Sequence, residues 1–428
     1  MNIYELFSKT LSPAATLLLE QLRALPRAED ASIWLVGGSV RDLLQGESVR
    51  DFDFAFSSDL TPQIKTWARK AGGSWFWLDQ QRLQSRVLFS QYGLQFDFSG
   101  LRAPDIFADL RLRDFTVNAL AFCLGEESEL IDPLGGRADL EQGVLRSCGP
   151  TVLFDDPLRI LKGFRHFAEY GWQIEARTGQ EMVRAASDLE RVAGERIKSE
   201  LGRILNSERV VFTLGLLIEY GVLRQLFPTL KEDTLVGKLD SFGARILQLE
   251  VFPELKTLLD AQMEDCVPRR ALLFFAALLE HLSGPGDILQ TFKRLCFSNG
   301  SRAILTRLCL GAELLPAMFS DHTSSRAAAL KVEAMAPCCI EALLFTLARR
   351  DCDDLDSLAA GHITAYLEHE TRGEIAHLLD GTTIMDLTGL KPGQGIGLWQ
   401  DRIKSAEIAG EITDRQTALD WLKVRFCD

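Results

Sequence analysis

In residues 51–56 (DFDFAF) every second side chain is phenylalanine, a pattern that predicts a β-strand buried on one face only. A period of two places Asp51 and Asp53 together on the opposite face, roughly 6–7 Å apart along the strand. Hard carboxylate oxygens in this arrangement favour magnesium, and a pair of ions on the order of 3.5–4 Å apart serves phosphoryl transfer. The alternative is a solvated edge strand carrying surface acids, because a lone Asp-x-Asp is a weak motif.

The segment just upstream, residues 37–46 (GGSVRDLLQG), predicts a glycine turn that leads into a short helix. Ser39 is the expected helix cap. Gly37 and Gly38 allow close approach of a ligand to the backbone, and the free N–H groups at a helix N-terminus attract phosphate. Arg41 adds a cation one turn into the helix. Together with the acidic strand, this turn favours a nucleotide-binding site.

The order GG-x-V-R-D followed by D-x-D resembles the nucleotidyltransferase head shared by class II CCA-adding enzymes (tRNA nucleotidyltransferases) and bacterial poly(A) polymerases. The resemblance implies an α+β head with a polymerase-β-like mixed sheet, followed by an all-helical neck, body and tail. It further implies an enzyme that transfers nucleotides from CTP and ATP to a tRNA 3′ end, with Mg²⁺ as cofactor and pyrophosphate as product. In that activity Asp51 and Asp53 hold the metal, and Gly37, Gly38 and Arg41 contact the triphosphate.

A second alternating segment, residues 94–99 (LQFDFS), places Asp97 on the polar face of another predicted strand. The resemblance makes Asp97 a candidate third catalytic carboxylate beside the D-x-D strand. The alternative from spacing alone is an edge-strand acid near Arg102.

Residues 113–120 (RDFTVNAL) are similar to the family motif R-R-D-F-T-x-N-A, except that Leu112 replaces the first arginine. The resemblance implies that Arg113 reaches the triphosphate and that Asn118 contacts the nucleotide. A purely structural role for Asp114 and Asn118 at the start of a helix is the alternative.

Residues 154–165 (FDDPLRILKGFR) predict a capped amphipathic helix, and their charged residues recur every three positions. The segment is similar to the E/D-D-x-x-R motif, which implies that Asp156 and Arg159 select the incoming base while Lys162 and Arg165 assist. A carboxylate accepts from the exocyclic amino group of cytosine or adenine, and a guanidinium donates to the ring nitrogen. The alternative is a helix with a solvated basic face.

Two further segments are interpreted as structural supports. Residues 132–140 (DPLGGRADL) match the family linker between head and neck, with Asp132 capping a Gly-Gly bend. Residues 195–201 (ERIKSEL) match the E-R-x-x-x-E-L motif. There we predict pairing within the helix, between residues four positions apart such as Arg196 and Glu200.

The second half of the chain has a helical pattern without further chemistry, including leucine-rich segments at 272–282 and 325–335. The glycine-rich segment 388–397 is interpreted as a turn before a helix, because a phosphate loop needs a preceding strand and a Lys-Ser/Thr pair. The expected domains are a head, a neck, a body and a tRNA-binding tail, at residues 1–147, 148–205, 206–330 and 331–428.

The net charge of −13 argues against a uniformly basic nucleic-acid-binding protein, although a local basic cleft is compatible with it. The nine cysteines show no C-x-x-C pattern, which indicates a reducing cytoplasm and no zinc site. No apolar run is long enough to span a membrane, so a cytoplasmic location without a membrane partner is expected. The oligomeric state stays open.

The resemblance places the flexible loop of complete CCA-adding enzymes at residues 103–112 (APDIFADLRL), and it implies that this loop decides which nucleotides are added. Its apolar residues at near-helical spacing predict a short, packed segment, which favours CC addition over full CCA addition. One alternative is a bacterial poly(A) polymerase, although residues 72–79 lack the basic strand usual in that group. A non-catalytic RNA-binding module is a further alternative.

Overall fold

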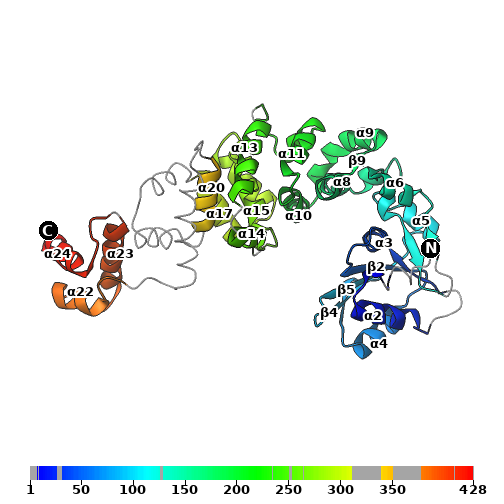
Figure 1. Ribbon diagram of the computed structural model, residues 1–428, viewed down its shortest axis with the longest axis horizontal. Coiled ribbons are helices and arrows are strands. Elements are labelled where there is room, and N and C mark those ends of the chain that lie inside the picture. The colour runs from blue at the N-terminus through cyan, green and yellow to red at the C-terminus, as the bar shows by residue number, and fades with distance from the viewer. Residues whose placement is uncertain are drawn as a thin grey trace. The chain divides into compact units, whose positions relative to one another are not determined.

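The computed structural model describes residues 7, 9–26, 31–125, 129–233, 235–249, 253–263, 265–310, 339–349, 377–408 and 410–427. The chain divides into two compact units, Met1–Pro228 and Thr229–Asp428 (Figure 1). The first unit contains a mixed sheet followed by helices, and the described residues of the second are mainly helical. The leucine-rich segment predicted at 325–335 lies outside the described residues.

A seven-stranded mixed sheet forms the centre of the first unit, with strand order β3-β4-β5-β2-β1-β6-β7. Strand β2 pairs in parallel with β5, and the other pairs in this sheet are antiparallel. The strands are β1 (Ile33–Val36), β2 (Asp51–Phe56), β3 (Ser74–Asp79), β4 (Gln84–Phe89), β5 (Leu94–Gly100), β6 (Ala121–Cys123) and β7 (Leu130–Ile131). The alternation in residues 51–56 and 94–99 thus predicts two neighbouring central strands correctly.

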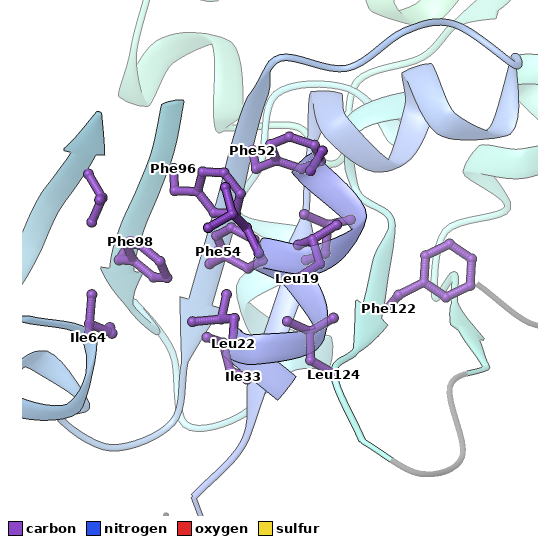
Figure 2. Close-up of a cluster of buried hydrophobic side chains, with 14 of the residues drawn as sticks. Leu19, Leu22, Ile33, Phe52, Phe54, Ile64, Phe96, Phe98, Phe122 and Leu124 are labelled. Carbon is purple, nitrogen blue, oxygen red and sulfur yellow. The ribbon is translucent and has the colours of Figure 1, made fainter. Parts of the chain in front are cut away.

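Phenylalanines fill the buried face of this sheet (Figure 2). Phe52 and Phe54 of β2 stack against Phe96 of β5, with ring centroids 4.9 and 5.6 Å apart. Helices α2 (Pro13–Arg23) and α4 (Thr61–Lys70) contribute apolar side chains to the same core. Burying each such ring stabilises the head by roughly 1.5–3 kcal/mol, so the register that turns the β2 acids away from the core is strongly favoured.

The rest of the first unit is mainly helical and begins with short elements around the sheet. These are α3 (Gly38–Leu44), α5 (Ile106–Arg111), η1 (Thr116–Asn118), α6 (Gly136–Gln142), α7 (Val152–Asp155), α8 (Leu158–Tyr170), α9 (Ala176–Ala185), η2 (Ala186–Arg191), α10 (Gly194–Leu205), α11 (Val210–Glu219) and α12 (Val222–Leu226), with a two-stranded sheet of β8 (Val144–Leu145) and β9 (Gln173–Ile174). Helix α8 packs on α10. Asp132 accepts hydrogen bonds from the N–H groups of Gly136 and Arg137, as the predicted cap requires.

Helices make up the described part of the second unit. They are α13 (Leu235–Leu249), α14 (Pro253–Asp260), α15 (Arg269–Leu279), α16 (Pro285–Arg294), α17 (Asn299–Leu310), α20 (Cys339–Arg349), α22 (Gly381–Thr388), α23 (Gln394–Ile408) and α24 (Arg415–Cys427). An ion pair of 2.7 Å between Arg269 and the buried Glu341 ties α15 to α20. Gly389 ends α22 with a φ of +71°, which confirms the turn predicted before a helix. None of the helices described here is both long and apolar enough to cross a membrane.

Candidate functional site

The acids of β2 face a cavity on the open side of the sheet. The parallel register places Asp53 directly opposite Asp97 of β5, and Asp51 opposite Gln95. Although the Asp53 carboxylate opens onto the cavity, burial by the surrounding walls raises its pKa to about 6. The negative charges of Asp97 and Asp51 add to this rise, whereas Arg113 opposes it. The strand therefore concentrates negative charge that a bound cation would relieve.

Asp97 differs from the two β2 acids because an arginine holds both of its oxygens. Arg86 of β4 donates to Oδ1 and Oδ2 of Asp97 at 2.8 Å each. Arg102, the neighbour suggested by spacing, instead pairs with Asp109 at 3.1 Å. Asp97 thus lies beside Asp53, as expected for a third carboxylate, but its charge is largely compensated.

The glycine turn and Arg113 form an anion-attracting corner next to Asp53. Gly37 has a φ of +75°, and a Cβ at this position would lie 2.9 Å from Nη1 of Arg113 and 3.6 Å from Oδ2 of Asp53. A side chain there would fill the space beside the guanidinium. Nε of Arg113 is buried without a hydrogen-bond partner among the described residues, and burial lowers the pKa of this arginine. The Arg113 side chain is still 18% exposed at the cavity, where its charge would attract an anionic ligand.

The prediction that Ser39 caps the short helix is wrong. Helix α3 begins at Gly38 with Gly37 as its N-cap. Ser39 instead donates its hydroxyl to the Val36 carbonyl at 3.3 Å and accepts from the Asp53 N–H at 2.9 Å. The hydroxyl therefore links the first turn of α3 to strand β2. This link fixes the position of the Asp53 backbone relative to the glycine turn.

Arg41 and Asn118 are joined in a buried polar network. The Arg41 guanidinium donates to Oδ1 of Asn118 at 2.7 Å and pairs with Asp42 at 2.7 Å. The amide nitrogen of Asn118 donates to Asp114 at 3.0 Å. Both side chains line the cavity, yet these contacts hold them in place. The geometry is compatible with ligand contact and with support of the turn.

The junction of α7 and α8 places Asp156 and Arg159 at the cavity, but their side chains are not paired with each other. Oδ2 of Asp156 accepts from Arg196 of α10 at 2.9 Å. Arg159 donates to the carbonyl oxygens of Val152 and Leu112, each at 3.0 Å. Three anchors from other segments thus hold the two side chains, one for the acid and two for the guanidinium. Their remaining lone pairs and N–H groups stay available for a ligand.

Lys162 and Arg165 lie further along α8, and both have acidic partners. Nζ of Lys162 lies 3.9 Å from Asp114 of the head. Arg165 is only 8% exposed and pairs with Glu169 at 2.6 Å and Glu200 at 2.8 Å. The pairing predicted within α10 is therefore wrong, because Arg196 and Glu200 both bind residues outside their own helix.

One cavity-lining residue, His166, has no counterpart among the sequence predictions. It is buried, and its pKa lies well below the usual range, first through burial and then through nearby cations such as Arg165. Its Nε2 lies 3.5 Å from the amide nitrogen of Asn118 and from Nη2 of Arg165. Since both neighbours are donors, Nε2 is the acceptor of a neutral ring. A lone histidine in a helical pattern gives no sequence signal for this role.

A single cavity of about 680 Å³ brings together every residue predicted for the site. They are Gly37, Gly38, Arg41, Asp51, Asp53, Asp97, Arg113, Asn118, Asp156, Arg159, Lys162 and Arg165. In the described part of the chain, no cluster of at least three His, Cys, Asp or Glu residues is suited to bind a metal. Asp51 and Asp53 nevertheless fit Mg²⁺, which proteins commonly hold through one or two carboxylates plus substrate phosphates.

Comparison with known proteins agrees with this arrangement. Residues 33–146 match the family described as the poly(A) polymerase head domain, and residues 171–234 match a probable RNA- and SrmB-binding site of polymerase A. A CCA-adding enzyme in complex with CTP has a TM-score of 0.75 at 23% identity, with 99% of this chain and 98% of that chain covered. The Thermotoga maritima CCA-adding enzyme complexed with tRNA has a TM-score of 0.73 at 22% identity, with 99% and 98% covered. These likenesses confirm the predicted fold.

Three relatives of similar length are all named tRNA nucleotidyltransferases. A CC-adding tRNA nucleotidyltransferase of Geobacter sulfurreducens is 33% identical over 412 residues, which cover 94% of each chain. An A-adding tRNA nucleotidyltransferase of Deinococcus radiodurans is 31% identical, with 90% of this chain and 93% of that protein covered. A CC-adding enzyme of Synechocystis is 27% identical, with 90% and 91% covered. On this similarity along almost its whole length, the chain belongs to the tRNA nucleotidyltransferase family, which includes the CCA-, CC- and A-adding enzymes.

Proposed function

We propose that this enzyme transfers cytidylate (CMP) residues from CTP to the 3′ end of tRNA, without a nucleic-acid template, and stops after two additions. The main support for this transfer reaction is that the residues it requires line one cavity. Two open carboxylates lie beside an anion-attracting corner and face an anchored acid and arginine that match the edge of cytosine. The attacking group is the RNA 3′-hydroxyl, and pyrophosphate leaves from the α-phosphate.

Each wall of the cavity has its own task in this proposal. The backbone at Gly37 and Gly38, with Arg113, holds the triphosphate. Asp156 accepts from the exocyclic amino group of the base, and Arg159 donates to its ring nitrogen. Uracil presents the reverse pattern and would leave the Asp156 carboxylate and the Arg159 guanidinium without partners on the base. A magnesium ion held by Asp51 and Asp53 would lower the pKa of the attacking hydroxyl and offset charge on the phosphate.

The limit to two cytidines follows from how α5 is anchored. Asp109 accepts from both the backbone N–H and the guanidinium of Arg102, and it pairs with Arg113 at 3.4 Å. Asp105 caps the N-terminus of the helix. A capped helix that Asp109 ties to Arg102 and Arg113 lacks the freedom to move the base-selecting residues between two states. The CC-adding names of the Geobacter and Synechocystis relatives agree with this proposal.

The test is to incubate the purified protein with tRNA that lacks its CCA end, in the presence of both CTP and ATP. Sequencing of the products should show mostly C-C ends, and tRNA that already ends in C-C should gain no adenosine. Mostly C-C-A ends would overturn the two-cytidine limit and leave tRNA end addition standing. Long adenosine tails on unrelated RNA would instead indicate a poly(A) polymerase.

A further inference from the structure

A row of side chains crosses the open face of the sheet and continues beyond the acids. The strand registers align Phe76 of β3 with Arg86 of β4, Arg86 with Asp97 of β5, and Asp97 with Asp53 of β2. Directly paired residues share a face, so all of these side chains lie on the side of the cavity. With strands about 4.8 Å apart, Phe76 lies about 14 Å from Asp53 along this row.

The apolar residues of β3 differ sharply between its two faces. Trp75 and Trp77 point to the face covered by α4, where the ammonium group of Lys65 lies 4.0 Å from the Trp75 ring centroid. On the cavity side, Phe76 is 38% exposed and Leu78 is 50% exposed. Leu78 also lines the cavity itself. The exposed apolar surface of this strand is thus continuous with the site.

The direction of the reaction indicates what occupies this surface. The triphosphate corner at Gly37 and Arg113 lies on the β1 side of Asp53. In an in-line displacement the attacking and leaving oxygens lie on opposite sides of the phosphorus atom. The RNA end must therefore approach the acids from the other side, which is the side of β5, β4 and β3.

We propose that Phe76 and Leu78 form the subsite for the unpaired nucleotides at the RNA 3′ end, with one base stacked on the Phe76 ring. The inference rests on the proposed function and adds the place where the acceptor strand binds. Unpaired bases bind proteins by stacking on aromatic rings and on arginine planes. Arg86, held flat by its two bonds to Asp97 and still 31% exposed, extends the same surface toward the acids.

The experiment uses tRNA trimmed of its CCA end and carrying 2-aminopurine as its last nucleotide. Binding to the wild-type protein should quench the 2-aminopurine fluorescence through stacking. Phe76→Ala should abolish most of this quenching and raise the KM for tRNA about fivefold to a hundredfold, the range expected for one lost base–aromatic stack. The KM for CTP should stay within twofold, whereas Phe76→Tyr should behave like the wild type.

Leu78→Ala and Leu17→Ala form a matched pair, since Leu17 is 53% exposed on α2, which covers the opposite face of the sheet. Only Leu78→Ala should weaken tRNA binding. Unchanged quenching and KM in Phe76→Ala, with tRNA still bound and extended, would overturn the inference and leave the proposed function intact. A rise in the KM for CTP alone would also overturn it, because the ring would then contact the nucleotide. Failure of the wild type to bind or extend trimmed tRNA would instead reject the proposed function.

Discussion

Asp51 and Asp53 on β2, called here the strand wall of the cavity, have no compensating cation within the residues that the structure describes, unlike Asp97 beside them. The helix wall, which consists of Asp156, Arg159, Lys162 and Arg165, instead has a partner for each charged side chain. Among the described residues, no cation lies within ion-pair distance of Asp51 or Asp53, and burial raises the pKa of Asp53 to about 6. On the helix wall Asp156 pairs with Arg196, and Arg165 pairs with two glutamates. Charged residues recur at regular spacing in the sequence of both walls. Spacing alone therefore does not tell which charges are paired in the folded protein.

The difference indicates what each wall contributes. Like charges held together without partners cost folding free energy, and a bound ligand can recover that cost. Paired charges hold a rigid geometry before the ligand arrives, which reduces the entropy lost on binding. We therefore expect substitutions in the strand wall to abolish activity without loss of stability. Substitutions in the helix wall should reduce stability or selectivity.

The largest effect is expected from Asp53→Ala and Asp51→Ala. Loss of a carboxylate that offsets phosphate charge should lower nucleotide transfer at least about a thousandfold, since such stabilisation amounts to several kcal/mol. The melting temperature should stay level or rise, because the repulsion between Asp53 and Asp97 is relieved. Labelled CTP incorporation and thermal melting measure the two effects. Near-normal incorporation by both folded variants would refute the metal-binding assignment.

Next in size is the effect of Glu200→Gln on stability. Arg165 would remain buried with Glu169 as its only acidic partner, which should cost about 3 kcal/mol. Glu195→Gln is the matched control, because Glu195 is exposed on the same helix and should change stability by under about 0.5 kcal/mol. Urea denaturation followed by circular dichroism measures both. Equal costs for the two variants would show that pairing does not stabilise the helix wall.

A smaller effect, on selectivity, is expected from replacing Asp156 and Arg159 together by alanine. The preference for CTP over UTP should fall roughly tenfold to a hundredfold, the value of one bidentate base contact. The neighbouring Asp155→Ala serves as the control, since Asp155 is exposed and absent from the cavity lining. Competition between labelled CTP and UTP gives the ratio. An unchanged preference in the double variant would refute base selection by these residues.

The smallest effect concerns Glu280 in the second unit, a carboxyl that is only 18% exposed and also paired. Burial raises its pKa to about 7, although Arg349 lies 3.1 Å away and opposes the rise. The folded state therefore holds a proton that the unfolded state has released, so stability falls as the pH rises toward 7. Between pH 6 and pH 8 the wild type should lose about 1 kcal/mol relative to Glu280→Gln. The free energy of unfolding in urea, measured against pH for the wild type and for Glu280→Gln, tests this. If the two curves run parallel, the ion pair with Arg349 compensates fully for the burial of Glu280.

The sequence predicts the strands well because their signal is local. Burying Phe52 and Phe54 requires one register, and that register alone decides which way Asp51 and Asp53 face. The glycine turn is similarly determined, since a φ of +75° at position 37 excludes most other residues. The residues proposed for the site were therefore identifiable, although their roles still depend on the experiments above.

The partners of the charged side chains were decided only by tertiary structure. Regular spacing predicts that Arg196 pairs within its helix, yet its guanidinium reaches Asp156 at the end of α7. Asp97 binds Arg86 from the adjoining strand, although Arg102 is the nearer arginine in sequence. The role of His166 as an acceptor likewise depends partly on a donor from another element, the Asn118 amide. Periodicity determines the face on which a side chain lies, whereas its partner depends on which elements pack together, and long-range packing fixes that choice.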